Sequence, residues 1–186
     1  MKVSAVLGAV LVPMALLAQM PDSPTNPITN GFKISGDRYA GWLVQAFDSI
    51  PASKYGFKPT PAQLTIGYIA QHLEDANYFI CGRFGGTMHP TTAKDSTADS
   101  VKATWPKDTL VARLKASVAF CDSAFAKVTD AQLTDPIPAG APGSGRTIIR
   151  ARYELGYVTD LVDHYSQMAN YMRLNGMTPP SSLRRP

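Results

Sequence analysis

Charged residues are scarce in this chain, at 17% of its 186 residues, and they are scattered instead of gathered into blocks. No stretch combines aromatic and basic residues in the manner of nucleic-acid-binding motifs, so we expect no nucleic-acid partner. The net charge of +4 bears on solubility and on little else. Hydrophobic residues make up 45% of the chain, which indicates one globular domain instead of a disordered protein.

The chain also lacks an apolar run long enough to cross a membrane, which takes about 20 residues. The longest run, 5–18, is interrupted by Pro13 and follows Lys2. This pattern is typical of a secretory signal peptide, so we predict a signal peptide over residues 1–18 and export to the periplasm or outside the cell. No cysteine lies near the predicted cleavage site, which argues against a lipid anchor.

No strand-like alternation and no internal repeat is visible, whereas helical spacing of apolar residues recurs in four segments. Residues 19–34 are rich in Pro, Asn, Ser and Thr, and we expect an unstructured leader there. The remaining residues, 35–183, are expected to form an all-α domain, a four-helix bundle. Its predicted helices cover residues 35–50, 60–83, 107–128 and 147–176.

The last predicted helix carries two stripes of residues at helical spacing. The first is aliphatic and is expected to pack against the core: Leu155, Val158, Val162, Tyr165, Ala169 and Met172. The second is aromatic and polar and is expected to line a pocket: Tyr153, Tyr157, Asp160, His164, Gln167 and Tyr171.

Asp160 and His164 stand one turn apart, a spacing at which two helix residues can hold one metal ion. His72, on the second predicted helix, would complete a set of three ligands, which leaves positions open as in catalytic sites. The alternative is that the three are ordinary hydrogen-bonded residues. The other residues that we expect to line the pocket are Tyr68, Asp75, Tyr157, Gln167 and Tyr171.

Two segments resemble the DinB-like superfamily: the stretch from Asp163 to Pro180, and the stretch from Lys58 through His72 to Phe79. The resemblance implies a four-helix bundle that binds a metal through three histidines, two of them at HxxxH spacing on the last helix. Here Asp160 stands in place of the first of that pair. A carboxylate also ligates divalent zinc, nickel, manganese or iron, so the site can persist with a changed metal preference.

The resemblance implies a metal-dependent enzyme, because characterised relatives include thiol-dependent transferases and isomerases, and some members are assigned as hydrolases. We expect a hydrolase or a transferase that acts on an unknown small molecule. The predicted export weakens the case for a transferase. The alternative is a non-catalytic bundle that binds a ligand or partner through a degenerate site. The sequence leaves open whether the protein forms a homodimer.

Cys81 and Cys121 either form a disulfide, as an oxidising compartment favours, or remain two buried thiols. Glu154 and Asp163 either assist the site or are solvated helix charges, and the second interpretation is the simpler. We interpret His89 as an exposed loop histidine.

Overall fold

Four long helices make up most of the computed structural model, which describes residues 25–140 and 143–183. They are α1 (Pro27–Ser49), α2 (Ile66–Gly85), α4 (Lys107–Phe125) and α5 (Arg150–Leu174). A fifth, short helix is α3 (Asp99–Lys102), and single 3-10 turns lie at Ala52–Lys54, Asp130–Gln132 and Pro180–Ser182. The chain is therefore mostly helical, as predicted. The predicted signal peptide lies outside the described residues.

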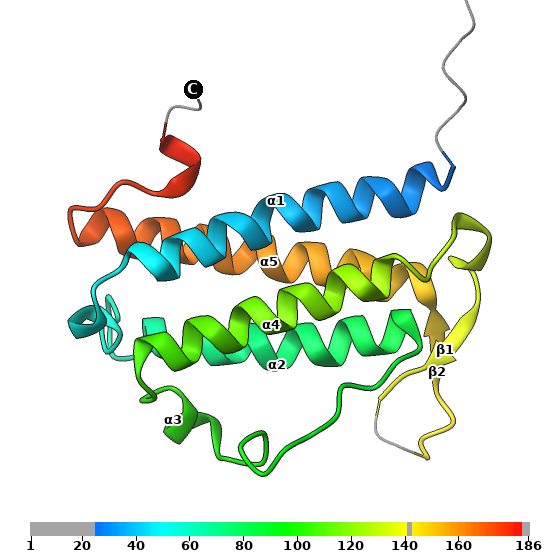
Figure 1. Cartoon of the computed structure of the whole chain (residues 1–186), viewed down its shortest axis with the longest axis horizontal. Coiled ribbons are helices and arrows are strands. Elements are labelled where there is room, and N and C mark those ends of the chain that lie inside the picture. The colour runs from blue at the N-terminus through cyan, green and yellow to red at the C-terminus, as the bar shows by residue number, and fades with distance from the viewer. Residues whose placement is uncertain (1–24, 141–142, 184–186) are drawn as a thin grey trace, which may run out of the picture.

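The long helices pack side by side, α1 against α4 and α5, and α2 against α4 and α5 (Figure 1). In Figure 1, α1 and α5 run in one direction, and α2 and α4 run in the other. Because α2 and α4 follow each other in the sequence and are parallel, the chain must return along the whole molecule between them. Residues 86–106, which we call the crossover segment, make this return below α2 and include α3.

A disulfide joins the cysteines of α2 and α4, with an S–S distance of 1.96 Å between Cys81 and Cys121. Both residues lie in the core, which is filled from all four long helices and is continuous along them. Its largest fully buried side chains include Leu43, Phe47, Ile69, Leu73, Phe84, Leu114, Leu161 and Met168.

Helix α1 begins at Pro27, eight residues before the predicted start, so the expectation of an unstructured leader over 19–34 is wrong from this residue on. The cap comes from a distant residue. The Asp130 carboxylate accepts the backbone N–H groups of Ile28 and Thr29 at 2.9 and 2.8 Å, and the Asp130 N–H donates to Asn26 Oδ1. A cap supplied from a hundred residues away leaves no signal in the local sequence.

Two further helix starts differ from the prediction. Helix α2 begins at Ile66 instead of residue 60, because the Thr65 hydroxyl oxygen accepts the N–H of Tyr68 and acts as the N-cap. Helix α5 begins at Arg150, since the preceding strand β2 (Thr147–Ile149) pairs antiparallel with β1 (Pro136–Pro138). The expectation of no strand was therefore wrong, although each strand has only three residues.

Buried ion pairs hold the crossover segment against the long helices. The Lys102 side chain is only 2% exposed and pairs with Asp75 of α2. Arg113 of α4 donates to Glu74 of α2 at 2.7 Å and also pairs with Asp95 of the crossover segment. These contacts fix a segment that the sequence presents only as a polar loop.

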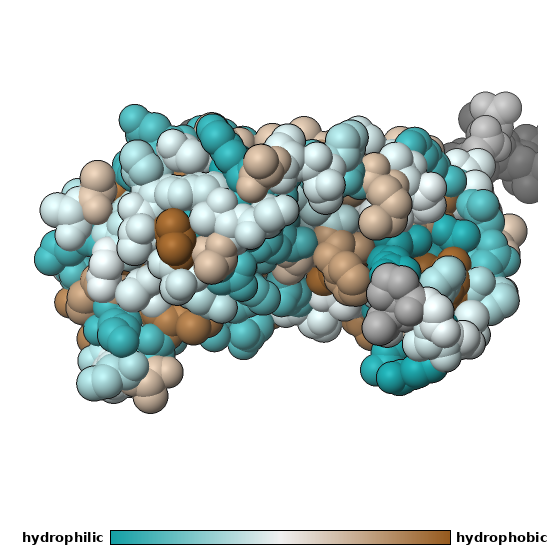
Figure 2. Space-filling model, turned by 90° about the horizontal axis from the view of Figure 1, so that it is seen from below, coloured by the Kyte–Doolittle hydropathy of each residue, from teal (hydrophilic) through white to brown (hydrophobic). Residues whose placement is uncertain are grey.

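No helix within residues 25–140 and 143–183 has the length and apolar character needed to cross a membrane. Figure 2 shows the lower face of the molecule, on which hydrophobic residues form small separate groups among polar ones.

Candidate metal centre

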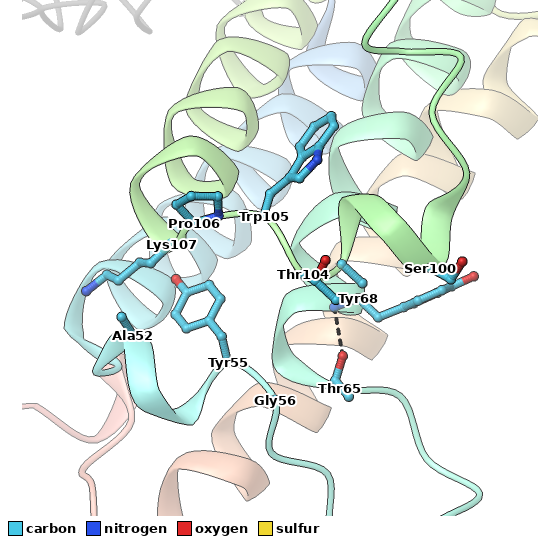
Figure 3. A pocket seen from close by; sticks show the side chains of 11 residues that line it. Ala52, Tyr55, Gly56, Thr65, Tyr68, Ser100, Thr104, Trp105, Pro106 and Lys107 are labelled. Atoms are coloured by element: carbon cyan, nitrogen blue, oxygen red, sulfur yellow. Dashed lines mark hydrogen bonds between the residues drawn. The ribbon is translucent and has the colours of Figure 1, made fainter.

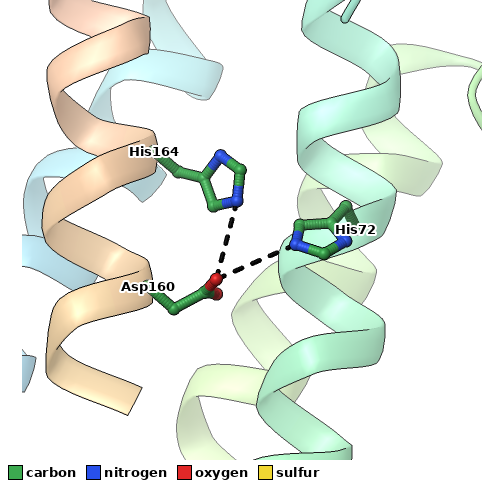
Figure 4. Close-up of side chains that lie close together, drawn as sticks. All are labelled: His72, Asp160 and His164. Atoms are coloured by element: carbon green, nitrogen blue, oxygen red, sulfur yellow. Dashed lines mark ion pairs between the residues drawn. The ribbon is translucent and has the colours of Figure 1, made fainter. Parts of the chain in front are cut away.

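His72 of α2 and Asp160 and His164 of α5 face one another between the two helices (Figure 4). Asp160 Oδ1 lies 3.8 Å from His72 Nε2 and 3.6 Å from His164 Nε2. One ligand atom from each residue lies within 4.8 Å of the other two. The side chains are 40%, 26% and 8% exposed for His72, Asp160 and His164, so solvent reaches the site from the His72 side.

A hydrogen-bond chain along α5 orients the buried histidine. His164 Nδ1 lies 3.2 Å from Gln167 Oε1, and the Gln167 amide donates to Asp163 Oδ2 at 3.3 Å. Because an amide oxygen only accepts, this contact assigns the proton of His164 to Nδ1 and leaves the Nε2 lone pair facing Asp160. Such outer partners of a ligating histidine fix its tautomer and ring orientation.

The interaction of the His72 ring with the Asp160 carboxylate raises the pKa of His72 above its ordinary value, although burial opposes this effect. Asp75 and Asp99 add to the increase through their negative charge. The site therefore has a surplus of negative charge and attracts a cation, either a proton or a metal ion.

The three residues fit a divalent metal ion. The two His–Asp distances exceed the hydrogen-bonding range of about 2.7–3.2 Å, and among the described residues the buried Oδ2 of Asp160 has no hydrogen-bond partner. Ligands about 2.0–2.2 Å from a tetrahedral ion lie roughly 3.4 Å apart. The set therefore needs only a small inward rotation of its side chains, and two imidazoles with one carboxylate suit zinc, nickel, manganese or iron.

The prediction for the two stripes of α5 is confirmed in part, because Tyr165, Ala169 and Met172 of the aliphatic stripe are buried in the core. The rest of its assignment of faces is wrong. Tyr153, Tyr157 and Tyr171 of the aromatic stripe are buried, whereas Leu155 and Val162 of the aliphatic stripe are exposed. Tyr157 packs against Gly36 of α1. Tyr157 and Tyr171 are therefore part of the hydrophobic core.

Tyr68, one turn before His72, lines a cavity whose lining residues include none of the three candidate ligands (Figure 3). This cavity has a volume of about 560 Å³ and lies where α2 begins, against the end of the crossover segment. Tyr55, Trp105 and Lys107 also line it, but the Tyr55 hydroxyl donates to Phe47 O and Lys107 donates to Asp48 O. Tyr55 and Lys107 are thus tied to the surrounding backbone.

Two side chains have a different place from the one predicted. Glu154 is fully buried in α5, not solvated. His89 stacks on Tyr78, with ring centroids 3.5 Å apart and planes 11° apart, and is not a freely exposed loop histidine. Helical spacing alone does not show either burial, because neighbours from other elements create it.

A comparison with protein families finds that the model described as "DinB superfamily" matches residues 41–168. The chain belongs to the DinB superfamily. The match includes all three candidate ligands of this DinB-superfamily protein. A comparison with curated proteins gives no match.

Solved structures share the fold of this DinB-superfamily chain. A DinB-like protein from Bacillus cereus is 20% identical, with a TM-score of 0.62 over 81% of this chain and 95% of that one. A conserved protein from Enterococcus faecalis is 17% identical, with a TM-score of 0.61 over 79% and 96%. A mycothiol-dependent maleylpyruvate isomerase is 11% identical, with a TM-score of 0.58 over 81% of this chain and 61% of that one. At these identities the likeness shows the fold alone.

Proposed function

We propose that this protein is an exported four-helix bundle of the DinB superfamily and a metal-dependent enzyme, a hydrolase or transferase that acts on a small molecule. One observation carries the proposal: a ligand atom from each of His72, Asp160 and His164 lies within 4.8 Å of the other two, and the buried Oδ2 of Asp160 has no hydrogen-bond partner among the described residues. A cluster bonded internally would support a non-catalytic bundle, but these distances are too long for that.

The three ligands have different tasks in this proposal. His164 is held rigid by Gln167, Asp160 supplies the negative charge that draws a cation in, and His72 forms the open side toward solvent. A bound divalent ion supplies Lewis acidity, which activates an oxygen or sulfur nucleophile at neutral pH. Three protein ligands leave room for the substrate on the His72 side.

The disulfide supports export and bears on the reaction. Disulfides persist in oxidising compartments, and the bond between Cys81 and Cys121 fits the predicted export. Low-molecular-weight thiols are kept in the reducing cytoplasm, so hydrolysis is the better supported reaction of the two. The isomerase that shares the fold is described as mycothiol-dependent, so a thiol-dependent transfer is the second reaction to test.

Metal analysis tests the proposal. The protein, purified without chelator and incubated with zinc, nickel, manganese or iron, is expected to hold about one ion per chain by plasma mass spectrometry. Asp160→Ala should lose the ion, whereas Asp160→His, which restores a third imidazole, should retain one. Asp122→Ala, which removes an exposed carboxylate of α4, is the matched control and should leave the metal content unchanged.

The proposal fails if the wild-type protein takes up none of the four metals, or if Asp160→Ala retains full occupancy. Circular dichroism of each variant checks that the helices are intact.

A further inference from the structure

A second cavity, of about 180 Å³, lies between α2 and the crossover segment. Asp75, Tyr78 and Phe79 line it from α2, and Met88, His89 and Asp95 from the crossover segment. We call it the Tyr78–His89 pocket. Asp75 and Phe79 lie three and seven residues after His72, so they share its face of the helix. At 1.5 Å per residue, Asp75 is about one turn, roughly 4.5 Å, along the axis from the candidate metal ligand.

Aromatic rings build the wall of this pocket. His89 stacks on Tyr78, and Phe120 of α4 meets the edges of both rings, at 5.3 Å from Tyr78 and 5.8 Å from His89. Phe79 and Met88 are 52% and 75% exposed at the opening. Both line the cavity together with the aromatic rings, and a mostly apolar lining with a few polar groups is typical of ligand pockets.

The charge around the pocket is negative. Glu74, Asp75, Asp95 and Asp99 form ion pairs with Lys102 and Arg113, and Arg83 lies over the Phe79 ring, so four carboxylates stand against three cations. Lys102 is 2% exposed, whereas its partner Asp75 is 39% exposed and lines the cavity. Asp95 also lines the cavity, and neither Lys102 nor Arg113 is among its lining residues. A ligand in the pocket therefore contacts these two carboxylates and not their cationic partners.

Asp95 keeps its charge at neutral pH. Burial alone would raise its pKa, but hydrogen bonds from Thr92 and Arg113 lower it to about 2. The Phe79 ring already attracts a cation of the protein, since the Arg83 guanidinium lies 5.2 Å from the ring centroid. Aromatic faces next to carboxylates are the surroundings that organic cations prefer.

We propose that the Tyr78–His89 pocket binds a small organic cation, an alkyl- or arylammonium group, and so holds the charged end of the substrate beside the metal ligands. The second half of this inference rests on the proposed function. The volume is below the roughly 300–1,000 Å³ of pockets that enclose a drug-sized ligand. The pocket therefore suits a head group, with the rest of the molecule extending toward His72.

Choline and its uncharged isostere 3,3-dimethylbutanol test the inference, because they differ in the charge and not in the shape of the head group. Calorimetry or ligand-observed NMR on the intact protein should show choline binding at least tenfold more tightly. Thr91→Lys places a cation in the pocket without removing an ion pair and should weaken choline binding at least tenfold, with no effect on the isostere. Ser96→Lys, on the same segment outside the pocket, is the matched control.

Phe79→Ala should weaken the binding of choline, whereas Leu155→Ala, a comparable truncation of an exposed side chain on α5, should not. Equal affinities for the two probes, or binding of neither, would overturn the inference. His72→Ala separates it from the proposed function. Loss of metal from this variant with choline binding retained supports the pocket, and a wild-type protein that holds metal but binds no choline overturns the pocket alone.

Discussion

At the scale of single residues, Glu154 has the most unfavourable position, because burying a carboxyl group without a partner costs free energy. It is fully buried in α5, and among the described residues neither carboxylate oxygen has a hydrogen-bond partner. Burial raises its pKa to about 7, and the negative charge of Asp130 adds to this, while Arg150 opposes it. A carboxyl group in such surroundings is held in its neutral form through most of the acidic range.

The raised pKa predicts that stability falls as the pH rises. The folded state binds the proton of Glu154 more tightly than the unfolded state, whose pKa is near the ordinary value of about 4.3. This contribution is complete below pH 4 and is lost between the two pKa values. By pH 8 the loss amounts to roughly 3 kcal/mol of unfolding free energy. Urea denaturation at pH 5 and pH 8 measures it.

Glu154→Gln cannot ionise, so we expect it to lack this part of the pH dependence and to exceed the wild type in stability at pH 8. Glu74→Gln is the control, because Glu74 is buried with an Arg113 partner and its loss should destabilise at both pH values. Parallel pH profiles for Glu154→Gln and the wild type would show that Glu154 ionises freely.

At the scale of helices, the sequence predicts which segments are helical more reliably than where they begin or which face they bury. The start of α4 at Lys107 is as predicted, whereas α1 takes its cap from Asp130, a contact that exists only after folding. The buried stripe of α5 runs between the two predicted stripes, through Glu154, Leu161 and Met168. The prediction relied on apolar periodicity, and the buried Glu154 interrupts that periodicity, so the stripe was not recognised.

Two of the candidate ligands could be predicted from helical spacing. Asp160 and His164 lie on a single helix, so their spacing alone brings them together. His72 was predicted as the third ligand from its place on the second predicted helix, and the family resemblance then supported it, although nothing local on α2 shows that it faces α5. The Tyr78–His89 pocket could not be predicted, since half of its wall comes from the crossover segment, which has no periodic pattern.

Two glycines of α1 offer a test of helix packing. A Cβ at Gly36 would lie 2.7 Å from Cε1 of the buried Tyr157 ring, closer than packed carbon atoms allow. We expect Gly36→Ala to lower the free energy of unfolding by about 1–2 kcal/mol, because the clash outweighs the gain in helix propensity. A Cβ at Gly41 meets nothing within 4 Å. Gly41→Ala should therefore raise stability by about 0.5–1 kcal/mol.

Thermal and urea unfolding of the two variants decide the point. If both glycines gained stability on substitution, α1 and α5 would not approach as closely at Gly36 as the structure shows.

At the scale of the whole molecule, one covalent bond and two ion pairs hold the crossover segment. The disulfide closes a loop with a sequence separation of 40, and this loop contains the entire crossover segment. Lys102 and Arg113 fix the same segment to α2 through Asp75 and to α4 through Asp95. Both the disulfide and the ion pairs therefore position the wall of the Tyr78–His89 pocket.

Removal of the disulfide is expected to lower the free energy of unfolding by about 4 kcal/mol, since a loop of this length gains that much entropy in the unfolded chain. The variant with both Cys81→Ala and Cys121→Ala should show this loss, and dithiothreitol should reduce the wild type to a similar stability without affecting the variant. The metal content should stay unchanged, because His72, Asp160 and His164 all lie outside the closed loop. If the oxidised wild type and the variant unfolded at the same urea concentration, the ion pairs alone would hold the crossover segment. Loss of Lys102 or Arg113 would then affect choline binding more than any other property.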